Sequence, residues 1–362
     1  MNNQSSINSK ELVIVTKHFG NGGAERVMSE LIGAWLDKGL KITLVILRPE
    51  LCNNDYWVDK RIEIVNVEPK SSFIRRIASV RVLVKLLKRK PDAVVLSLVT
   101  PAILITGLAS FFVKNKVVFS ERNDPQKTPR GWYRRWIRNI VFNFADKCVF
   151  QTEQAMRYFS NRIQKRGFII KNPINPELPL PFAGKRRKCI VAVARLEEQK
   201  NLPMLINAFN FVHTDYPEYI LEIYGRGKLE KELKLLIDSL GLSENIVLKG
   251  FSTDIYNKMN DCTMYVSSSN YEGISNSMLE ALALGLPTIC TDCPVGGAHE
   301  MIENNVSGML IPVGDTVALS NAMKKVIEDK DFANNISRNS IIIRKKYDIN
   351  LIADKWLEVL FS

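Results

Sequence analysis

The sequence predicts an α/β protein built from two doubly wound parallel sheets, each in its own domain. Short apolar runs alternate with longer amphipathic segments along the whole chain, which is the pattern of parallel strands connected by helices. With 362 residues the chain is long for a single hydrophobic core, and two domains of roughly 170 to 190 residues are expected. Hydrophobic residues make up 46% of the chain and charged residues 24%, which is typical of a globular protein and not of a disordered one.

The predicted domain boundaries follow from a change in composition near the middle of the chain. Residues 172–188 are rich in proline and asparagine and end in a basic run, which is typical of an interdomain linker. We therefore expect an N-terminal domain at residues 1–171 and a C-terminal domain at residues 189–348. The tail at residues 349–362 predicts a helix with one hydrophobic face.

The first domain opens with a predicted strand at residues 11–16, followed by a glycine loop at residues 18–25 and an amphipathic helix. Gly20, Gly22 and Gly23 allow the backbone of this loop to approach a ligand closely. The loop also follows the carboxyl end of a strand, where α/β sheets bind their ligands. It lacks the full G-x-G-x-x-G pattern of a dinucleotide site, so a tight turn between strand and helix is the alternative.

Further strands of this domain are expected where short apolar runs recur, at residues 41–47, 93–98, 117–120 and 147–152. Residues 93–113 come nearest to a membrane span, because they carry no charge. Ser, Thr, Pro and Gly interrupt this segment, so we interpret it as a buried strand followed by a helix.

The first domain is strongly basic, whereas the second is mildly acidic. Residues 1–171 carry 30 Lys and Arg against 14 Asp and Glu, and residues 172–362 carry 20 against 24. Within the basic half, residues 71–90 combine apolar and basic side chains at helical spacing, and residues 131–138 interleave Arg with Trp and Tyr. Such segments can lie at a membrane interface, with their cations toward lipid phosphates. The alternatives are a solvated basic helix face and a nucleic-acid partner.

Cysteine usage and the N-terminal residues favour a cytosolic chain. The six cysteines mostly lie scattered in apolar contexts, as reduced thiols do. Cys290 and Cys293 form a C-x-x-C, but no second pair follows at zinc-ribbon spacing, so thiols at a strand end are preferred over a metal or redox site. The first ten residues are polar and do not resemble a secretory signal.

The second domain begins with a predicted buried strand at residues 189–194, directly followed by Arg195 and Lys200. The planar guanidinium and the ammonium are five residues apart across a strand-to-helix turn, so they can hold two phosphates of one ligand. Separate surface charges are the alternative. The remaining predicted elements are strands at residues 221–224, 246–251, 288–290 and 306–311, a glycine turn with Gly225 and Gly227, and helices at residues 229–240 and 317–328.

The most informative stretch is residues 266–287, which predicts a strand, a turn at Gly273 and a helix that begins near Ser277. The first N–H groups of a helix have no partner within it and its dipole is positive there, so this turn suits a phosphate. Glu272 lies just before the turn and Glu280 one turn into the helix, so both can face one ligand. Alternatively, Ser277 and Glu280 form a capping box that only closes the helix end.

These motifs resemble those of the family-4 glycosyltransferases, which are retaining enzymes of the GT-B fold that use nucleotide sugars. Glu272 and Glu280 match the E-x7-E motif within EGISNSMLEALALGLPTI, Arg195 and Lys200 match R-x4-K-N, and the Gly-Gly and Glu300 of CPVGGAHEMI also fit. The resemblance covers most of the chain and is strongest in the second half. It implies two Rossmann-like domains that face each other across a cleft, with the terminal helix returning to the first domain.

The resemblance also implies roles for these residues. Glu272 is expected to contact the sugar hydroxyls and Glu280 the ribose, with retention of the anomeric configuration. Arg195, Lys200 and the N–H groups near residues 274–277 are expected to stabilise the departing diphosphate without a metal or other cofactor. The expected donor-binding set is Gly22, Gly23, Gly225, Gly227, Gly273, Ile274, Ser275, Asn276, Ser277 and Glu280.

The first domain departs from the family pattern at one point. Many relatives carry a histidine near the strand that ends at Ser120, close to the donor sugar, and this sequence has none there. Glu121 or Arg122 is expected to take its place on the acceptor or sugar side.

The sequence therefore predicts a glycosyltransferase that moves a hexose or N-acetylhexosamine from a UDP-sugar to a lipid-linked saccharide in O-antigen, lipopolysaccharide or capsule assembly. The expected location is cytoplasmic, peripheral on the inner face of the cytoplasmic membrane, with an anionic membrane surface and no nucleic acid as partner. A nucleotide-sugar epimerase of the same fold is one alternative. A basic nucleic-acid-binding protein is another, although no RNA or DNA module is present. A paired-carboxylate hydrolase is disfavoured, because neither glutamate has the sequence environment of a glycosidase acid.

Overall fold

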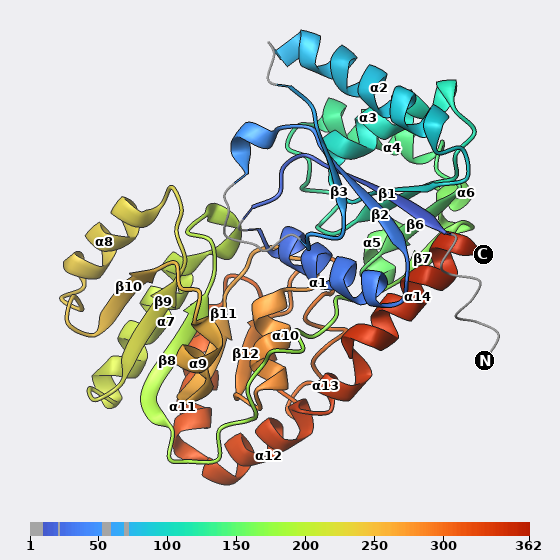
Figure 1. Cartoon of the computed structure of the whole chain (residues 1–362). Helices are drawn as coiled ribbons and strands as arrows, with labels where there is room; N and C mark the ends of the chain where they lie inside the picture. Colours follow the sequence, from blue (N-terminus) through green and yellow to red (C-terminus); the bar gives the residue numbers. More distant parts are fainter. Residues whose placement is uncertain (1–9, 21, 53–58, 69–71) are drawn as a thin grey trace. The chain divides into compact units, whose positions relative to one another are not determined.

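The chain forms two α/β units, which are visible as separate sheets with their own helices in the computed structural model (Figure 1). The structure describes residues 10–20, 22–52, 59–68 and 72–362. The first unit runs to Pro173 and includes Ile349–Ser362, and the second unit is Ile174–Asp348. The prediction of an α/β chain with two doubly wound parallel sheets is confirmed.

The first unit contains a seven-stranded parallel sheet in the order β3-β2-β1-β4-β5-β6-β7. Its strands are β1 (Glu11–Thr16), β2 (Lys41–Ile46), β3 (Glu63–Asn66), β4 (Val94–Ser97), β5 (Val117–Glu121), β6 (Lys147–Phe150) and β7 (Gly167–Ile169). Val13 pairs with Thr43 of β2 on one side and with Val95 of β4 on the other. The strand order reverses between β1 and β4, and sheets of this type bind ligands at the carboxyl ends of such neighbours.

Helices connect these strands where the sequence has helical periodicity. They are α1 (Gly23–Asp37), α2 (Ser72–Arg89), α3 (Thr100–Ala109), α4 (Trp132–Phe142), α5 (Glu153–Arg157) and α6 (Asn161–Gln164), with short 3-10 turns η1 (Pro49–Leu51) and η2 (Ser110–Phe112). The uncharged segment at residues 93–113 is divided among β4, α3 and η2, as predicted. Within the described part of the chain, no helix combines the length and the apolar character that crossing a bilayer requires.

The last helix, α14 (Ile349–Phe361), belongs to the first unit and packs against α1. The rings of Trp35 and Trp356 are both fully buried and meet edge to face, with centroids 6.3 Å apart. Trp35 Nε1 donates a hydrogen bond to the Ala353 carbonyl at 3.2 Å. Figure 1 shows α14 beside α1, although the two helices lie at opposite ends of the sequence.

The second unit contains a six-stranded parallel sheet in the order β10-β9-β8-β11-β12-β13. Its strands are β8 (Arg187–Val193), β9 (Ile220–Tyr224), β10 (Ile246–Gly250), β11 (Cys262–Ser267), β12 (Thr288–Thr291) and β13 (Met309–Ile311). The connecting helices are η3 (Glu198–Lys200), α7 (Leu202–Asp215), α8 (Glu230–Ser239), α9 (Ile255–Asn260), α10 (Asn276–Ala283), α11 (Thr316–Glu328), α12 (Lys330–Ser340) and α13 (Ile343–Lys346). The strand order reverses between β8 and β11, the two strands that precede the predicted motifs.

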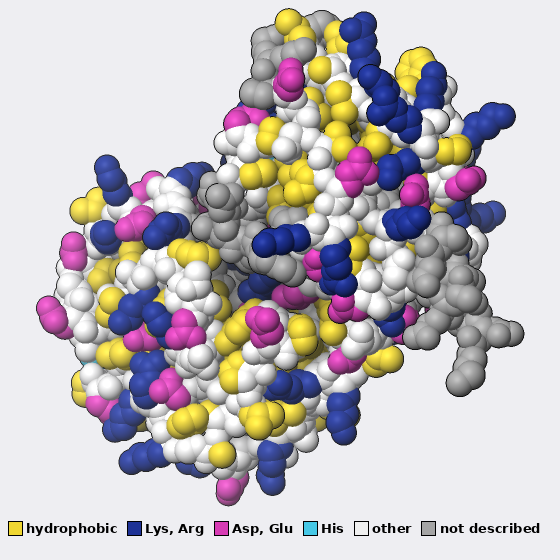
Figure 2. Space-filling model, viewed as in Figure 1, with side chains coloured by type: hydrophobic (Ala, Val, Ile, Leu, Met, Phe, Trp, Pro, Cys, Tyr) yellow, Lys and Arg dark blue, Asp and Glu magenta, His cyan; other side chains and the backbone are white. Residues whose placement is uncertain are grey.

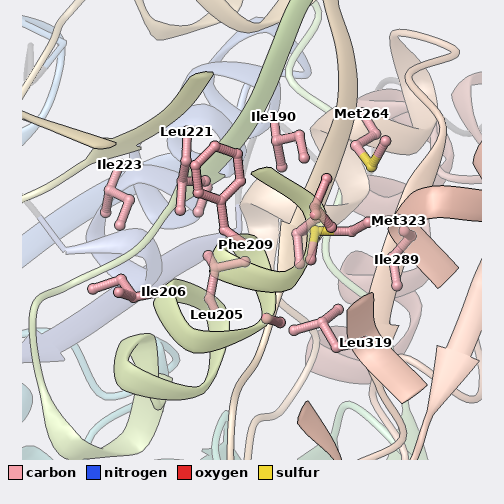
Figure 3. Packing of buried hydrophobic residues seen from close by; sticks show 14 of the residues in the cluster. Ile190, Leu205, Ile206, Phe209, Leu221, Ile223, Met264, Ile289, Leu319 and Met323 are labelled. Atoms are coloured by element: carbon pink, nitrogen blue, oxygen red, sulfur yellow. The ribbon is translucent and has the colours of Figure 1, made fainter. Parts of the chain in front are cut away.

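One face of this sheet is covered by α7 and α11, which pack with the strands into a buried hydrophobic cluster (Figure 3). Phe209 of α7 and Met323 of α11 are fully buried against strand residues such as Ile190. Burying one such side chain contributes roughly 1.5 to 3 kcal/mol. The strands are thereby fixed in position, and their carboxyl ends carry the loops of the candidate site.

Candidate active site

The candidate site is built on the loops that follow β8 and β11. Lys200 ends the short turn η3 and is 9% exposed, and Asn201 behind it has a left-handed backbone with φ 43°. Arg195 lies directly after the strand and keeps 58% of its side chain exposed. Its guanidinium contacts Glu197 at 3.0 Å and Gln199 at 3.3 Å. The exposed fork of Arg195 can therefore still bind an anion.

Lys200 and Glu272 form a direct ion pair between the two loops. The ammonium contacts Glu272 Oε2, and the side chains are 11% and 20% exposed. Ser269 Oγ donates a second hydrogen bond to the same oxygen at 3.2 Å. The structure thus brings together two of the three predicted catalytic residues, which lie 72 positions apart in the sequence.

Backbone and side-chain hydrogen bonds join the same two loops further. Gln199 Nε2 donates to the Tyr271 carbonyl at 2.9 Å, and the Asn270 N–H donates to the Gln199 carbonyl at 2.8 Å. Ser268 Oγ donates to the Lys200 carbonyl at 2.9 Å. Gln199, Ser268 and Ser269 were not predicted as site residues, and their only signal in the sequence is the serine run after β11.

Gly225 and Gly227 serve close backbone packing beside Arg195. A Cβ on Gly225 would lie 1.9 Å from the Ala194 carbonyl oxygen, and one on Gly227 would lie 2.3 Å from that of Leu196. The Leu196 N–H donates to the Arg226 carbonyl at 3.0 Å, which holds the two segments together. Both predicted donor-binding glycines therefore lie next to the Arg195 loop.

The Gly273 turn is supported by the loop at residues 293–297. A Cβ on Gly297 would lie 1.9 Å from the Gly273 carbonyl oxygen, so only glycine allows this approach. Val295 in the same loop has φ 78°, a strained conformation for a β-branched residue. This loop contains the Gly-Gly pair of the predicted motif, and it fixes the backbone directly after Glu272.

The helix after the turn begins earlier than predicted. It is α10, and Ser275 is its N-cap, so Ser277 is the second helical residue. The Ser277 hydroxyl contacts the Val193 carbonyl at 3.1 Å and the Tyr265 hydroxyl at 2.8 Å. The alternative of a capping box, with Ser277 as N-cap and Glu280 at the third helical position, is therefore wrong in register. Glu280 is 4% exposed within the helix, and Asn276 and Ile274 lie at its positive end.

The residues predicted in the first unit lie at two places, in the loop after β1 and at the end of β5. Gly22 is the N-cap of α1 and Gly23 its first residue, so both lie at the carboxyl end of β1. Glu121 ends β5 and its carboxylate accepts hydrogen bonds from Arg138 at 2.9 Å and from the Arg122 N–H at 3.2 Å. Burial raises the pKa of Glu121, and Arg138 opposes that rise.

Arg122 and Arg138 are both committed to contacts within the first unit. Arg122 donates to the Ile170 carbonyl at 3.1 Å and to Asn172, and burial lowers its pKa to about 10. Arg138 is fully buried and also donates to the Pro125 carbonyl at 2.8 Å. We expected Arg138 to lie on the exposed basic surface of residues 131–138, and this expectation is wrong. Arg138 is buried, where it forms an ion pair with Glu121.

Two groups of thiols lie in the second unit. Burial raises the pKa of Cys293 to about 12 and also raises that of Cys290, which suits unreactive structural thiols. Cys189 and Cys262 lie near Glu222. Their two Sγ atoms and a carboxylate oxygen, the atoms that could bind a metal ion, lie within 4.8 Å of one another. Arg187 and Lys249 pair with the Glu222 carboxylate at 3.5 and 3.3 Å, so two cations already neutralise it.

Comparison with known proteins gives consistent matches over both units. Residues 21–178 match the family model described as Glycosyltransferase Family 4, and residues 181–342 match that described as Glycosyl transferases group 1. The chain is 25% identical over 364 residues to the amylovoran biosynthesis glycosyltransferase AmsD of Erwinia amylovora, covering 97% of this chain and 99% of that protein.

A second relative comes from Campylobacter jejuni and is named GalNAc-alpha-(1->4)-GalNAc-alpha-(1->3)-diNAcBac-PP-undecaprenol alpha-1,4-N-acetyl-D-galactosaminyltransferase. It is 23% identical over 350 residues, covering 94% of this chain and 95% of that protein. Among solved structures, Anabaena HepE in complex with UDP and glucose superposes with a TM-score of 0.84 at 19% identity, covering 97% and 99% of the two chains. The fold is therefore GT-B, and the chain belongs to the family-4 glycosyltransferases.

Proposed function

We propose that this glycosyltransferase moves a hexose or N-acetylhexosamine from a UDP-sugar to a lipid-linked saccharide, with retention of the anomeric configuration. The observation that carries the proposal is the Lys200–Glu272 pair between the loops after β8 and β11, with the exposed guanidinium of Arg195 on the first loop. The cations of these two loops can bind the anionic diphosphate of a nucleotide sugar, and the carboxylate can bind the hydroxyl groups of its sugar ring.

The leaving group requires stabilisation of negative charge as its bond to the sugar breaks. Arg195 offers a planar fork of N–H donors, and Lys200 offers an ammonium held in place by Glu272. The N–H groups at the start of α10 add the positive end of a helix dipole. Fixed donors of this kind stabilise developing charge without reorganising, and they do so without a divalent cation.

Glu272 is proposed to accept hydrogen bonds from the sugar hydroxyls. Its carboxylate is fixed by Lys200 and Ser269 and remains 20% exposed, so it has further acceptor capacity. Glu280 is proposed to accept a hydrogen bond from the ribose. The glycines Gly225, Gly227 and Gly273 complete the proposed donor site by allowing the backbone segments around it to pack closely.

The acceptor proposal rests on the relatives and on the surface of the first unit. The Campylobacter relative is named for an undecaprenol-diphosphate-linked saccharide, and AmsD for the biosynthesis of a polysaccharide. On the first unit, Trp132 and Trp136 are 75% and 61% exposed, and Figure 2 shows Lys and Arg side chains over α2. Within α4 itself, the Arg134 guanidinium lies over the Tyr133 ring, 5.6 Å from its centroid. Aromatic rings beside cations suit an anionic bilayer surface. We therefore propose that the enzyme acts at the inner face of the cytoplasmic membrane.

A transfer assay tests the proposal. Purified protein with EDTA is incubated with UDP-hexoses or UDP-N-acetylhexosamines and a panel of undecaprenyl-diphosphate-linked mono- and disaccharides. We expect one donor to be transferred and the new linkage to keep the donor's anomeric configuration by NMR. Epimerised sugar formed without acceptor would instead identify an epimerase. No reaction with any pair, together with salt-sensitive oligonucleotide binding, would favour the nucleic-acid alternative.

Vesicle flotation tests the membrane part. The wild type is expected to float with vesicles that contain phosphatidylglycerol and to stay in solution with purely zwitterionic ones. A Trp132→Ala, Trp136→Ala variant should bind the anionic vesicles more weakly. Equal recovery of both proteins with both vesicle types would contradict a membrane contact through α4.

A further inference from the structure

His18 lies in the glycine loop of the first unit, at a point where the backbone is fixed on both sides. The loop follows β1, and Thr16 Oγ1 donates a hydrogen bond to the His18 carbonyl at 3.0 Å. The next residue, Phe19, is buried, and its N–H donates to Cys52 Sγ at 3.2 Å. The imidazole is therefore presented from an anchored backbone at the carboxyl end of a central strand.

Glu25 is the carboxylate beside this imidazole. His18 Nδ1 is buried and lies 3.7 Å from Glu25 Oε1, beyond hydrogen-bond distance and without another partner among the described residues. Glu25 is the third residue of α1, and its carboxylate folds back over the N-cap. A Cβ on Gly22 would lie 1.9 Å from Glu25 Oε2, so glycine at that position makes room for the carboxylate.

The two nitrogens of His18 are therefore in different environments. The side chain is 28% exposed although Nδ1 is buried, so the exposed atoms include other parts of the ring, where Nε2 is the remaining polar atom. A carboxylate next to Nδ1 favours the proton on that nitrogen, which leaves Nε2 as a hydrogen-bond acceptor. Hydrogen bonds of this kind are often long in the absence of substrate and shorten when it binds.

We propose that His18, oriented by Glu25, accepts a hydrogen bond at Nε2 from a hydroxyl of the saccharide acceptor. The proposal rests on the proposed function and deepens it by naming an acceptor-binding residue. The alternatives from the sequence are less suitable, since Glu121 is bonded to Arg138 and Arg122 to Ile170 and Asn172. In His18, Nε2 is available to accept a hydrogen bond, and the Glu25 carboxylate orients the ring.

Two substitutions of His18 separate binding from a merely structural role. His18→Asn keeps a polar atom near the position of Nδ1 and removes the one at Nε2, whereas His18→Gln keeps a polar atom near Nε2. We expect His18→Asn to lower kcat/KM for the best acceptor of the panel by roughly 10- to 100-fold, as for loss of a hydrogen bond to a fixed group. His18→Gln should retain most of the activity, and donor-induced thermal stabilisation should be unchanged in both variants. The opposite order, or equal activity of all three proteins, would overturn the proposal.

A spectroscopic measurement tests the orientation without any turnover. The chain has three histidines, so 15N-labelled imidazoles give few signals, and the His18 signal is identified by its loss in His18→Asn. We expect neutral His18 to carry its proton on Nδ1, and Glu25→Gln to shift it toward Nε2. Glu30→Gln, which changes another glutamate of α1, is the matched control and should leave the His18 signal unchanged. A proton on Nε2 in the wild type would overturn the proposal.

The two hypotheses fail in distinguishable ways. A wild type that transfers no sugar overturns the proposed function, and the acceptor role of His18 with it, while the tautomer measurement still reports on the Glu25 contact. A wild type that transfers sugar with an acceptor dependence unaffected by His18→Asn overturns only the His18 proposal.

Discussion

Two carboxylate–cation pairs, one in each unit, follow strands of a parallel sheet and differ in what they leave for a ligand. Arg138 and Glu121 are 0% and 7% exposed, and their remaining hydrogen bonds go to the Asn139 side chain and to backbone groups of the same unit. Lys200 and Glu272 are 11% and 20% exposed, and the loop of Lys200 also carries the exposed Arg195. The Glu121–Arg138 pair stabilises the fold and is too buried to contact a ligand. The Lys200–Glu272 pair is partly exposed and can still bind one. The degree of burial, and not the residue types, distinguishes a structural pair from a candidate site.

Breaking the buried pair should have the largest effect. Arg138→Leu leaves the Glu121 carboxylate buried without its cation, which is expected to lower the free energy of unfolding by about 3 to 5 kcal/mol. The double variant Glu121→Leu, Arg138→Leu should recover much of that loss, because no charge is left buried. Urea unfolding of the two variants and the wild type measures both values. A single variant as stable as the wild type would show that the pair is not structural.

Breaking the half-buried pair should affect activity more than stability. Lys200→Ala and Glu272→Gln are each expected to lower the rate of sugar transfer by roughly 10²- to 10³-fold, the range for losing one preorganised charge-stabilising group. Their free energies of unfolding should change far less than that of Arg138→Leu, since both side chains retain access to water. Transfer rates and urea unfolding are measured on the same preparations. If these variants lost as much free energy of unfolding as Arg138→Leu, the pair would be structural.

Glu222 offers an intermediate case that is sensitive to pH. Burial raises its pKa, but Arg187, Tyr224 and Lys249 outweigh that effect, so the pKa lies below the ordinary value of 4.5. Because the folded-state pKa is depressed, this stabilisation is present above about pH 4.5 and is lost as the pH falls through the folded-state pKa. Glu222→Gln should therefore be less stable than the wild type at pH 7, and the difference should shrink below pH 4.5. A difference that grows on acidification would contradict the sign.

An exposed pair of the second unit completes the series with the smallest effect. Lys188 and Glu218 lie 2.9 Å apart with side chains 57% and 43% exposed. Surface pairs of this kind contribute little, because water screens them. Lys188→Ala is expected to leave both the urea midpoint and the transfer rate unchanged within error. A clear loss of transfer in this variant would show that charge anywhere on the second unit matters, and not the Lys200–Glu272 pair.

The strands and the long helices could be predicted from the sequence because their apolar periodicity is strong. The edge strands β3 and β7 were not predicted, since they are short and partly exposed and carry little hydrophobic signal. In the same way, α12 at Lys330–Ser340 has mostly polar residues and gave no clear pattern.

The sequence identifies residues of the candidate site, but it does not show which of them contact one another. The motifs identify Lys200 and Glu272, but their ion pair depends on β8 and β11 being neighbours in the sheet, which no local pattern encodes. Arg138 was assigned to the basic surface because it belongs to a stretch of arginines and aromatic residues in the sequence, and only the position of Glu121 explains its burial. The alternative with Ser277 as a helix cap failed because the N-cap is Ser275, two residues earlier in the chain.

The most direct test of the central claim is a thermal-shift screen of UDP- and GDP-sugars in EDTA, on the wild type, Glu272→Gln and Glu280→Ala. A ligand that binds only the folded state raises its melting temperature. We expect one UDP-sugar to stabilise the wild type without a divalent metal, and both substitutions to abolish or greatly reduce this rise in melting temperature. If no nucleotide sugar changes the melting temperature of the wild type, the residues around the Lys200–Glu272 pair do not form a donor site, and the proposed function is contradicted.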